Sequence, residues 1–595
     1  MAKSVPISNS FDLDRVFTHR FQRRDGARSR QKPIHALDTE TWKGNIFLMA
    51  DSDGRFLDDI SIESVLKFLF HKKYQNSWNF FYRIGYDAEV ILKLLDERLK
   101  AYRQTRTLQF RLDDYRLTYI PDKVLRISKG HHSVSFYDIA QFYKASLEVA
   151  YSSSIGDVPE WYSEMKKRRS HFSNSYYHHN RKNVRKYCIH DCVLTKHLAH
   201  YWTEQFHNAF GFYLSKWISS GYAAEKVLIN NQIEIPKFDT VPYEVQKMAW
   251  SVVDHGGRFE ITRRGYIGQA YMYDINSAYP YALTQIPDIT KGKWIRRKSI
   301  HEDAKLGFFR VLADIPDGKS VSPFPFKDKI RIFFPTGKFE TRVTLHELKA
   351  CDSKFYKILD SYQFIPNKET IGDIKPYKKF ISELYQKRLE LKKKNSPIEK
   401  PIKLILNSIY GKTGQKTNGM MGNLYNPVIF ISITGIIRAA LYQFVMEKKI
   451  ERDVVAFATD SVMTRRKIDV DSEALGEFSF EKQASDCYLL QNGYYRMNGE
   501  WKNRGIASMN GKTIKHLDTY VKNGKLFLKI QESRSTRLRS GIILDRIHDI
   551  GNIKPTIRWV DPNADRKRFW LGRIDRIDYS YNDSMPIPMN YFNQV

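Results

Sequence analysis

Two aspartates at the ends of apolar strands constrain the fold of this chain more than any other feature. The segment AYMYDINSAYPYAL predicts an apolar strand that ends at Asp274 and then turns. The segment RDVVAFATDSVMTRR contains two β-rich runs broken at Thr459, Asp460 and Ser461, which predicts a hairpin with Asp460 near its tip. We expect the two carboxylates to meet and to hold hard divalent cations.

A helix with one polar face is expected between these two aspartates. In KLILNSIYGK the side chains of Lys403, Asn407 and Tyr410 recur once per helical turn, so they share one face. This face either carries a polar ligand or belongs to an ordinary amphipathic helix. Next to two Mg²⁺ ions that activate a 3′-hydroxyl, such a helix would supply a cation to the phosphates of a triphosphate.

A second set of acids lies in the N-terminal third of the chain. The segment PIHALDTET predicts a short buried strand on which Asp38 and Glu40 project from one face. Asp87 lies at the start of an amphipathic helix, and Tyr187 and Asp191 lie one turn apart on a later helix. Each pattern is common alone. Together the acids predict two divalent ions that activate water at a phosphodiester.

The composition favours a polyanionic partner. The 595 residues include 97 Lys and Arg against 66 Asp and Glu, a net charge of +31 that is spread along the chain. Interleaved basic and aromatic residues suit a nucleic acid better than a membrane, although a generally basic proteome would give the same charge. The four cysteines lack metal-ligand or disulfide spacing, and neither a signal peptide nor a membrane span is expected. The expected location is therefore intracellular, in the host cytoplasm or nucleoid, without secretion.

The motifs, in this order, resemble two known families. The N-terminal set is similar to the three motifs of the DEDDy 3′–5′ exonuclease domain. The sequences DINSAYP, KLILNSIYG and TDS resemble motifs A, B and C of family B DNA polymerases. This resemblance implies a multidomain α+β chain, in which an RNase H-like exonuclease domain precedes a right-hand polymerase domain with palm, fingers and thumb.

The resemblance implies a role for each matching residue. The metal ligands would be Asp274, Ile275 and Asp460 in the polymerase site and Asp38, Glu40, Asp87 and Asp191 in the exonuclease site, where Tyr187 would orient the attacking water. Nucleotide contacts would come from Ser277, Tyr279, Arg388, Lys403, Asn407 and Tyr410. DNA contacts would come from Ser146, Leu147, Gly256, Gly257 and Tyr494. The implied cofactor is Mg²⁺, two ions per active site, which Mn²⁺ can replace.

The chain departs from the family pattern at four positions. Arg83 stands where the exonuclease motif usually has Asn, and Ala458 stands where motif C often has Asp. Asp254 replaces the Tyr of the linker before HGGRFE, and Asn492 replaces the Lys near the thumb. None of the four is an implied metal ligand.

The spacing of the motifs resembles the protein-primed branch of the family. The stretch between motifs A and B has room for the first insertion of that branch, where a terminal protein docks, whereas the stretch between motifs B and C is too short for the second. Weaker strand displacement and processivity are therefore expected. The expected domains are a basic lead-in (1–30), the exonuclease (31–215), the linker and first part of the palm (216–283), the insertion (284–375), the fingers (376–425), the palm (426–505) and the thumb (506–595).

Three further expectations concern partners and segments. The partners would be template and primer DNA, dNTPs and a terminal protein primer. The protein is expected to be a monomer and to have no membrane partner. A nucleic-acid primer, or initiation without any primer, stays open, as does a DNA-binding protein or nuclease with an inactive polymerase site. The basic stretch 166–186 lacks apolar periodicity and is interpreted as a loop over the exonuclease cleft.

Overall fold

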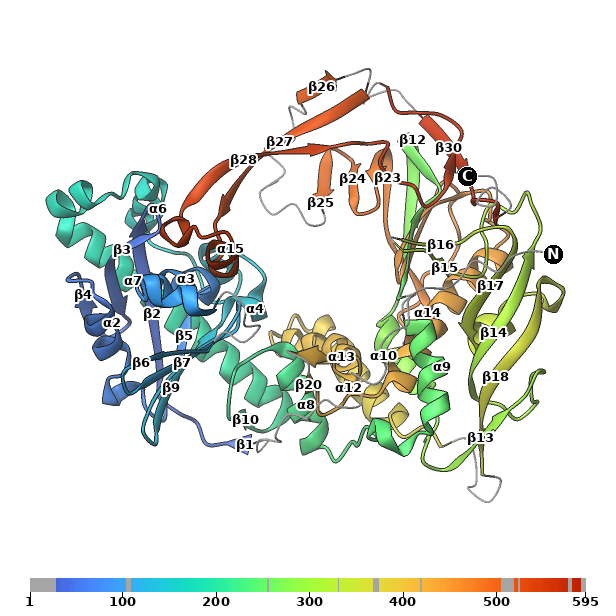
Figure 1. The fold of residues 1–595 in the computed structure, drawn as a ribbon, viewed down its shortest axis with the longest axis horizontal. Coiled ribbons are helices and arrows are strands. Elements are labelled where there is room, and N and C mark those ends of the chain that lie inside the picture. Colours follow the sequence, from blue (N-terminus) through green and yellow to red (C-terminus); the bar gives the residue numbers. More distant parts are fainter. Residues whose placement is uncertain are drawn as a thin grey trace.

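The elements of the chain follow one another around a ring in Figure 1, from the N-terminal unit on the left through the lower helices to the sheets on the right and top. The computed structural model describes residues 28–102, 109–253, 256–329, 331–367, 374–417, 420–503, 518–522, 525–575 and 581–589. Within these ranges, helices and strands mix throughout, as expected for a multidomain α+β chain.

The N-terminal unit is built on an eight-stranded mixed sheet. Its order is β4-β3-β2-β5-β9-β8-β7-β6, and β2, β5 and β9 run parallel. The strands are β2 (Ile34–Trp42), β3 (Asn45–Asp51), β4 (Phe56–Leu57), β5 (Trp78–Phe81), β6 (Gln109–Leu112), β7 (Tyr115–Ile120), β8 (Val124–Lys129) and β9 (His132–Asp138). Helices α3 (Ile84–Lys93) and α7 (Asn174–Phe210) pack on this sheet. Ser173 caps the start of α7, and Gly211 at φ 76° ends it.

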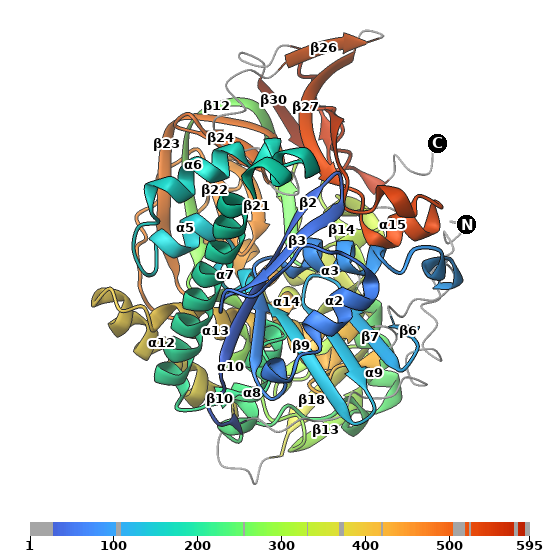
Figure 2. The ribbon, with the colours of Figure 1, turned by 90° about the vertical axis from the view of Figure 1, so that its left-hand side faces the viewer.

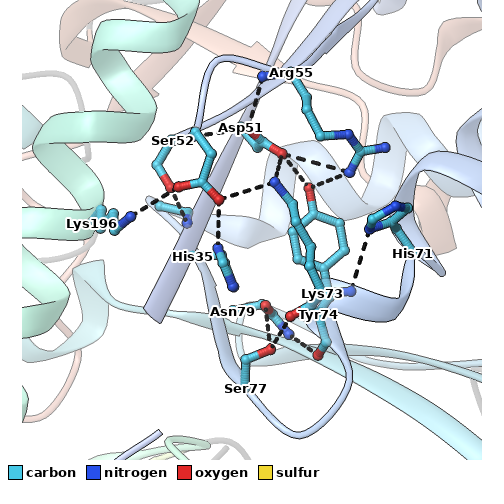
Figure 3. Close-up of polar contacts among 12 residues, drawn as sticks. His35, Asp51, Ser52, Arg55, His71, Lys73, Tyr74, Ser77, Asn79 and Lys196 are labelled. Atoms are coloured by element: carbon cyan, nitrogen blue, oxygen red, sulfur yellow. Dashed lines mark hydrogen bonds and ion pairs between the residues drawn. The ribbon is translucent and has the colours of Figure 1, made fainter. Parts of the chain in front are cut away.

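A polar cluster holds β3 and α7 in place (Figure 3). The carboxylate of Asp51, which is fully buried, accepts hydrogen bonds from Lys73 Nζ (2.5 Å) and Tyr74 Oη (2.7 Å). Asp53 accepts a hydrogen bond from Lys196 Nζ of α7 (2.9 Å) and lies 2.9 Å from Nδ1 of His35 on β2. Because α7 and β2 carry the predicted exonuclease residues, this cluster fixes their relative position.

The largest sheet has nine strands and lies at the opposite side of the ring. Its main path is β11-β21-β22-β12-β23-β24-β25, and β30 joins it through β12. The strands are β11 (Arg258–Ile261), β12 (Arg263–Ile275), β21 (Val454–Thr459), β22 (Ser461–Thr464), β23 (Phe478–Gln491), β24 (Tyr494–Met497), β25 (Glu500–Asn503), β29 (Phe569–Trp570) and β30 (Tyr581–Met585). Helices α10 (Ala278–Thr284) and α14 (Pro427–Glu447) pack against each other beside this sheet.

Helix α14 is apolar on nearly all sides. Asn426 caps it by accepting a hydrogen bond from the N–H of Ile429 (3.2 Å), and Pro427 occupies its first turn. By length and composition α14 could cross a membrane, which the expectation from the sequence overlooked. However, 83% of its most apolar stretch is buried inside the protein, as is typical of a core helix.

Two smaller modules flank the nine-stranded sheet. The segment between motifs A and B forms a four-stranded antiparallel sheet in the order β13-β18-β14-β17, capped by α11 (Leu345–Lys349). Its strands are β13 (Gly292–Arg296), β14 (Leu306–Ile315), β17 (Gly337–Thr344) and β18 (Tyr356–Pro366). We call this module the insertion lobe; it has the α+β character expected from the sequence. The second module is a helical pair, α12 (Lys378–Lys393) and α13 (Glu399–Thr413), which packs on α8 (Ser220–Asn230).

The C-terminal module bridges the ring. It is a three-stranded sheet of β26 (Asp518–Lys522), β27 (Lys525–Ser535) and β28 (Ile553–Val560). The connection between β27 and β28 contains α15 (Leu538–Ile543), whose Leu538 and Ile542 are buried in the core of the N-terminal unit. The strand β30, which falls in the thumb predicted from the sequence, returns to β12 and so belongs to the nine-stranded sheet.

The structure corrects the interpretation of the basic stretch 166–186. This stretch forms the end of α6 (Glu160–Arg168), a short 3-10 turn (Arg169–His171) and the first turns of α7. The amphipathic pattern is hidden because α7 changes direction at Asn180, whose φ of −121° is not helical. Helices α5 (Leu147–Ser152), α6 and α7 lie together on the side that faces the viewer in Figure 2.

Candidate active sites

The two strand-end aspartates lie at the same edge of the nine-stranded sheet. Asp274 near the end of β12 stands opposite Ser461, and the N–H of Ile275 donates to the main-chain carbonyl of Asp460 (3.1 Å). The hairpin turns within three residues: the N–H of Asp460 donates to the carbonyl of Ala458 (2.9 Å), and Thr459 has a φ of 72°. The strand-end placement of both acids is as predicted.

Burial and like charge raise the pKa values of these two acids. Burial raises the pKa of Asp274 to about 7, with further contributions from Asp460 and then Glu481. Burial also raises the pKa of Asp460 to about 6, with a contribution from Glu481. Burial disfavours the charged form of these acids, and a bound cation favours it again. Oxygen donors of this kind fit Mg²⁺ or Mn²⁺.

Glu481 was not found from the sequence. It lies on β23 at an irregularity in the pairing, where Met272 is opposite Lys482 but Tyr273 is opposite Phe480. The extra residue at this bulge is Glu481, and a bulge re-aims the side chain that it carries. No sequence pattern around Glu481 predicts the bulge, because the bulge depends on the partner strand.

A pocket of aromatic and basic side chains lies beside the acids. Ser277 adopts a left-handed conformation (φ 47°) at the start of α10, and its hydroxyl accepts a hydrogen bond from Arg388 Nη1 (3.3 Å). The rings of Tyr279 and Tyr410 lie 4.4 Å apart, and Tyr410 stacks on Phe430 at 4.8 Å. The structure therefore joins predicted residues of α10, α12 and α13 in one place.

Helix α13 shows the polar face that its sequence predicts. Its buried side includes Ile402, Ile405, Leu406 and Ile409. Lys403 and Asn407 are exposed on the other side, and Tyr410 is half-buried. The ammonium group and the amide are thus available to a ligand.

A glycine turn approaches the same pocket. A Cβ atom on Gly257 would lie 3.0 Å from Thr459 Cγ2 and 3.5 Å from Tyr279 Oη, so a larger residue would crowd the site. The carbonyl of Gly256, a residue at φ 55°, accepts a hydrogen bond from Arg438 Nη1. Arg438 is buried in α14 and forms an ion pair with Glu347 of the insertion lobe (2.8 Å). In the sequence, Arg438 stands out only as a lone charged residue within an apolar stretch.

The N-terminal acids also form one cluster. Ligand atoms of Asp38, Glu40 and Cys188 all lie within 4.8 Å of one another. Thr39 Oγ1 donates to Asp87 Oδ1 (2.6 Å), which orients that carboxylate beside β2. Asp191 Oδ1 accepts a hydrogen bond from Tyr162 Oη (2.5 Å).

The electrostatics of this cluster resemble those of the first site. Burial raises the pKa of Glu40 to about 7 and that of Asp87 to about 6. Burial likewise raises the pKa of Asp38 and of Asp191. Arg169, whose Nε lies 3.4 Å from Glu40 Oε2, lowers the pKa values of all four acids, and Lys166 also lowers that of Asp191. The oxygen-rich donor set fits divalent metal ions.

Two aromatic residues complete the cluster, one predicted and one missed. The rings of Tyr187 and Tyr162 stack at 5.2 Å, and both are buried. The hydroxyl of Tyr187 is buried without a hydrogen-bond partner, which leaves it available to a water molecule or substrate. Neither Tyr162 nor Arg169 stands in a motif, and Arg169 was hidden in the run interpreted as a loop.

The predicted DNA contacts separate into two groups. Ser146 is exposed before α5, next to Ala145, whose carbonyl accepts hydrogen bonds from Tyr82 Oη (2.8 Å) and Arg83 Nη2 (3.3 Å). Leu147 follows it and is half-buried. Arg83, which stands where the family usually has Asn, is thus exposed beside the predicted DNA contacts Ser146 and Leu147.

Tyr494 belongs to the second group. It is only 4% exposed and stacks on Trp501 at 5.2 Å, so the structure places its ring in a core and does not support a direct DNA contact. The nearby Asn492 donates to the carbonyl of Phe457 (3.2 Å). The departure at Asp254 lies outside the described residues.

The fold and the site geometry define a multidomain α+β protein with two separate clusters of buried carboxylates. The sequence model of the family described as DNA polymerase type B, organellar and viral, matches residues 125–423, about half of the chain. The chain therefore belongs to this family, which confirms the resemblance found in its motifs.

Two similar proteins, one curated relative and one with solved structures, agree with this assignment. The DNA polymerase of Acidianus bottle-shaped virus (isolate Italy/Pozzuoli) is 25% identical over 362 residues, which cover 55% of this chain and 53% of the relative. The chain thus spans about half the length of the curated relative it matches.

Among solved structures, the Phi29 DNA polymerase with primer-template DNA and incoming nucleotide is 14% identical, with a TM-score of 0.58 over 90% of this chain and 100% of the other. The binary complex of Phi29 DNA polymerase with primer-template DNA gives 14% identity and a TM-score of 0.57 over 89% and 100%. This likeness shows that the two chains share a fold. It confirms the expected multidomain α+β fold.

Proposed function

We propose that the chain is a DNA-directed DNA polymerase with a 3′–5′ editing exonuclease. The observation that carries the polymerase assignment is the meeting of Asp274 and Asp460 at one sheet edge, with both pKa values raised. Among the groups that shift the pKa values of these two acids there is no cation, and Glu481 adds a third carboxylate. Family membership supports the same reading.

In the polymerase site Asp274 and Asp460 would hold the divalent ions, which would lower the barrier to attack by the 3′-hydroxyl on the triphosphate. Lys403 on the exposed face of α13 contacts the phosphates. Arg388 reaches the same region through its hydrogen bond to Ser277. The neighbouring rings of Tyr279 and Tyr410 form the wall against the nascent base pair and the sugar.

In the exonuclease site the four acids hold the ions and Tyr187 orients the attacking water. The buried hydroxyl of Tyr187 lies beside the Asp191 carboxylate, where it can reach a water molecule held by the acids. Arg169 compensates the negative charge of Glu40 and is placed to meet the phosphate of the scissile nucleotide. Arg83 and Ser146 hold the single-stranded primer end near Ala145.

We further propose protein priming, which is supported by the insertion lobe between motifs A and B and by the likeness to Phi29 DNA polymerase. The partners are then DNA, dNTPs and a terminal protein, and the proposed setting is the host cytoplasm or nucleoid. A nucleic-acid primer is the second candidate, because the site is built for any 3′-hydroxyl and the donor lies on another molecule.

A primer-extension assay tests this assignment. The variant Asp460→Ala should lose nucleotide incorporation but keep 3′ degradation, and Asp38→Ala should show the reverse. Incorporation that persists in Asp460→Ala would overturn the polymerase site. Extension that begins only on a terminal protein, and never on an annealed oligonucleotide, would distinguish protein priming from the second candidate.

A further inference from the structure

A basic groove runs between α6 and α7 on the outside of the N-terminal unit, on the side that faces the viewer in Figure 2. It is an open hollow of about 550 Å³. Its lining is mainly basic and aromatic and consists of Trp161, Arg181, Lys182, Arg185, Lys186, Ile189, His190 and Val193. None of these residues has a role in the proposed catalysis.

The groove and the exonuclease acids occupy opposite faces of α7. At 100° per residue, Lys182, Lys186 and His190 cluster on one side of the helix, whereas Tyr187 and Asp191 point to the other. The burial agrees, because Lys182 and Lys186 are exposed while Tyr187 and Asp191 are buried. A ligand in the groove therefore does not occupy the exonuclease site.

The groove carries more positive charge than the protein neutralises. Arg185 forms an ion pair with Asp58, and Arg181 is close enough to that carboxylate to lower its pKa. Within the described part of the chain, Lys182 and Lys186 form no ion pair, and a concave surface with such an excess of cations attracts a polyanion. Their spacing along one helix suits successive phosphates of a flexible strand.

Aromatic rings lie among these cations. Lys186 Nζ sits 4.1 Å from the centre of the Trp161 ring, and the rings of Trp161 and His190 are 4.9 Å apart. The Nε2 of His190 is buried without a hydrogen-bond partner. Cations beside stacking rings are the combination that binds single-stranded nucleic acid, whose bases are exposed.

We propose that this groove binds a single strand of nucleic acid, separately from the two metal sites. The phosphates pair with Arg181, Lys182 and Lys186, and a base stacks on Trp161. This surface lies outside the proposed catalytic path, so it would hold a strand that is not being extended or degraded at that moment.

Binding of a fluorescent oligo(dT) in EDTA, measured by anisotropy against salt, tests the proposal. Three phosphate contacts contribute a slope of about 2 in log affinity against log salt, or about twenty-fold between 50 and 200 mM salt. The triple variant R181A/K182A/K186A should lose that part of the slope. The control K67A/K123A/R126A removes three exposed cations elsewhere on the same unit and should keep it.

Two further measurements separate a strand from an acidic protein. An oligonucleotide with 5-iodouracil should crosslink to Trp161 or His190, and Trp161→Leu should weaken oligo(dT) binding about five-fold or more without changing the salt slope. The proposal is overturned if the two triple variants lose the same slope, or if crosslinks map only to other aromatic residues. It is also overturned if polyglutamate binds as tightly as oligo(dT) and Trp161→Leu has no effect, since the partner would then be an acidic protein.

Discussion

Replacing Asp274 by Asn should stabilise the metal-free protein at alkaline pH. In the folded chain the pKa of Asp274 is about 7, against an ordinary value of 3.8, a rise of roughly three units. One unit corresponds to about 1.4 kcal/mol, so ionising this carboxyl in the folded, metal-free site costs about 4 kcal/mol at most. The isosteric amide carries no charge and removes this penalty.

The sign of the effect follows from proton binding. Between about pH 4 and pH 7 the folded state holds the Asp274 proton more tightly than the unfolded state, so stability falls as the pH rises through this window. In EDTA at pH 8 we expect Asp274→Asn to raise the local free energy of opening by about 2 to 4 kcal/mol. At pH 4 the difference should vanish, because both proteins are then neutral at this position.

Hydrogen exchange of peptides that cover β12 and β21 measures this local free energy without requiring the whole chain to unfold in one step. The control is Asp471→Asn, which changes an exposed carboxylate of the same unit and should have little effect. Saturating Mg²⁺ should reverse the order, because only the wild type gains binding energy at an intact site. Faster exchange in Asp274→Asn than in the wild type, in EDTA at pH 8, would refute the reasoning.

Four other changes have expected outcomes. Asp38→Ala should lower 3′ degradation of a labelled primer at least a hundred-fold at unchanged extension, and degradation at the wild-type rate would exclude Asp38 as a metal ligand. Tyr279→Val should raise ribonucleotide incorporation relative to deoxyribonucleotide incorporation at least ten-fold in single-nucleotide assays, and an unchanged ratio would remove Tyr279 from the sugar pocket. Lys403→Ala should raise the KM for dNTP about ten- to a hundred-fold in steady-state kinetics, from a lost charged hydrogen bond, whereas an unchanged KM would show that Lys403 does not touch the phosphates. Glu347→Ala leaves Arg438 buried and unpaired and should cost about 3–5 kcal/mol in local hydrogen exchange of α14, while protection equal to the wild type would contradict the pairing.

Local patterns predicted the catalytic elements well. The ends of β12 and β21, the polar face of α13 and the position of Asp87 on α3 depend on a few neighbouring residues, and the structure has each of them as expected. Periodicity is a short-range property, so it identifies which side chains share a face. The insertion lobe was also recognisable, because the alternation of apolar and polar residues in its sequence predicts strands.

Other features depended on partners distant in the chain. Glu481 comes close to the two aspartates through a bulge against β12, and Arg438 is held by a buried ion pair with the insertion lobe. Arg169 lies in a run whose helical pattern is interrupted by the kink at Asn180. Tyr494 matches a DNA-contacting position in sequence, but it is buried because Trp501 on the next strand covers it.

The most direct test of the account compares single-turnover nucleotide incorporation by Asp274→Ala, Asp460→Ala and the double variant. If both carboxylates belong to one cation site, either single change removes the whole site, and the double variant should be no slower than the singles. Losses that multiply in the double variant, or a single variant that still incorporates nucleotides at the wild-type rate, would show that the two acids act apart.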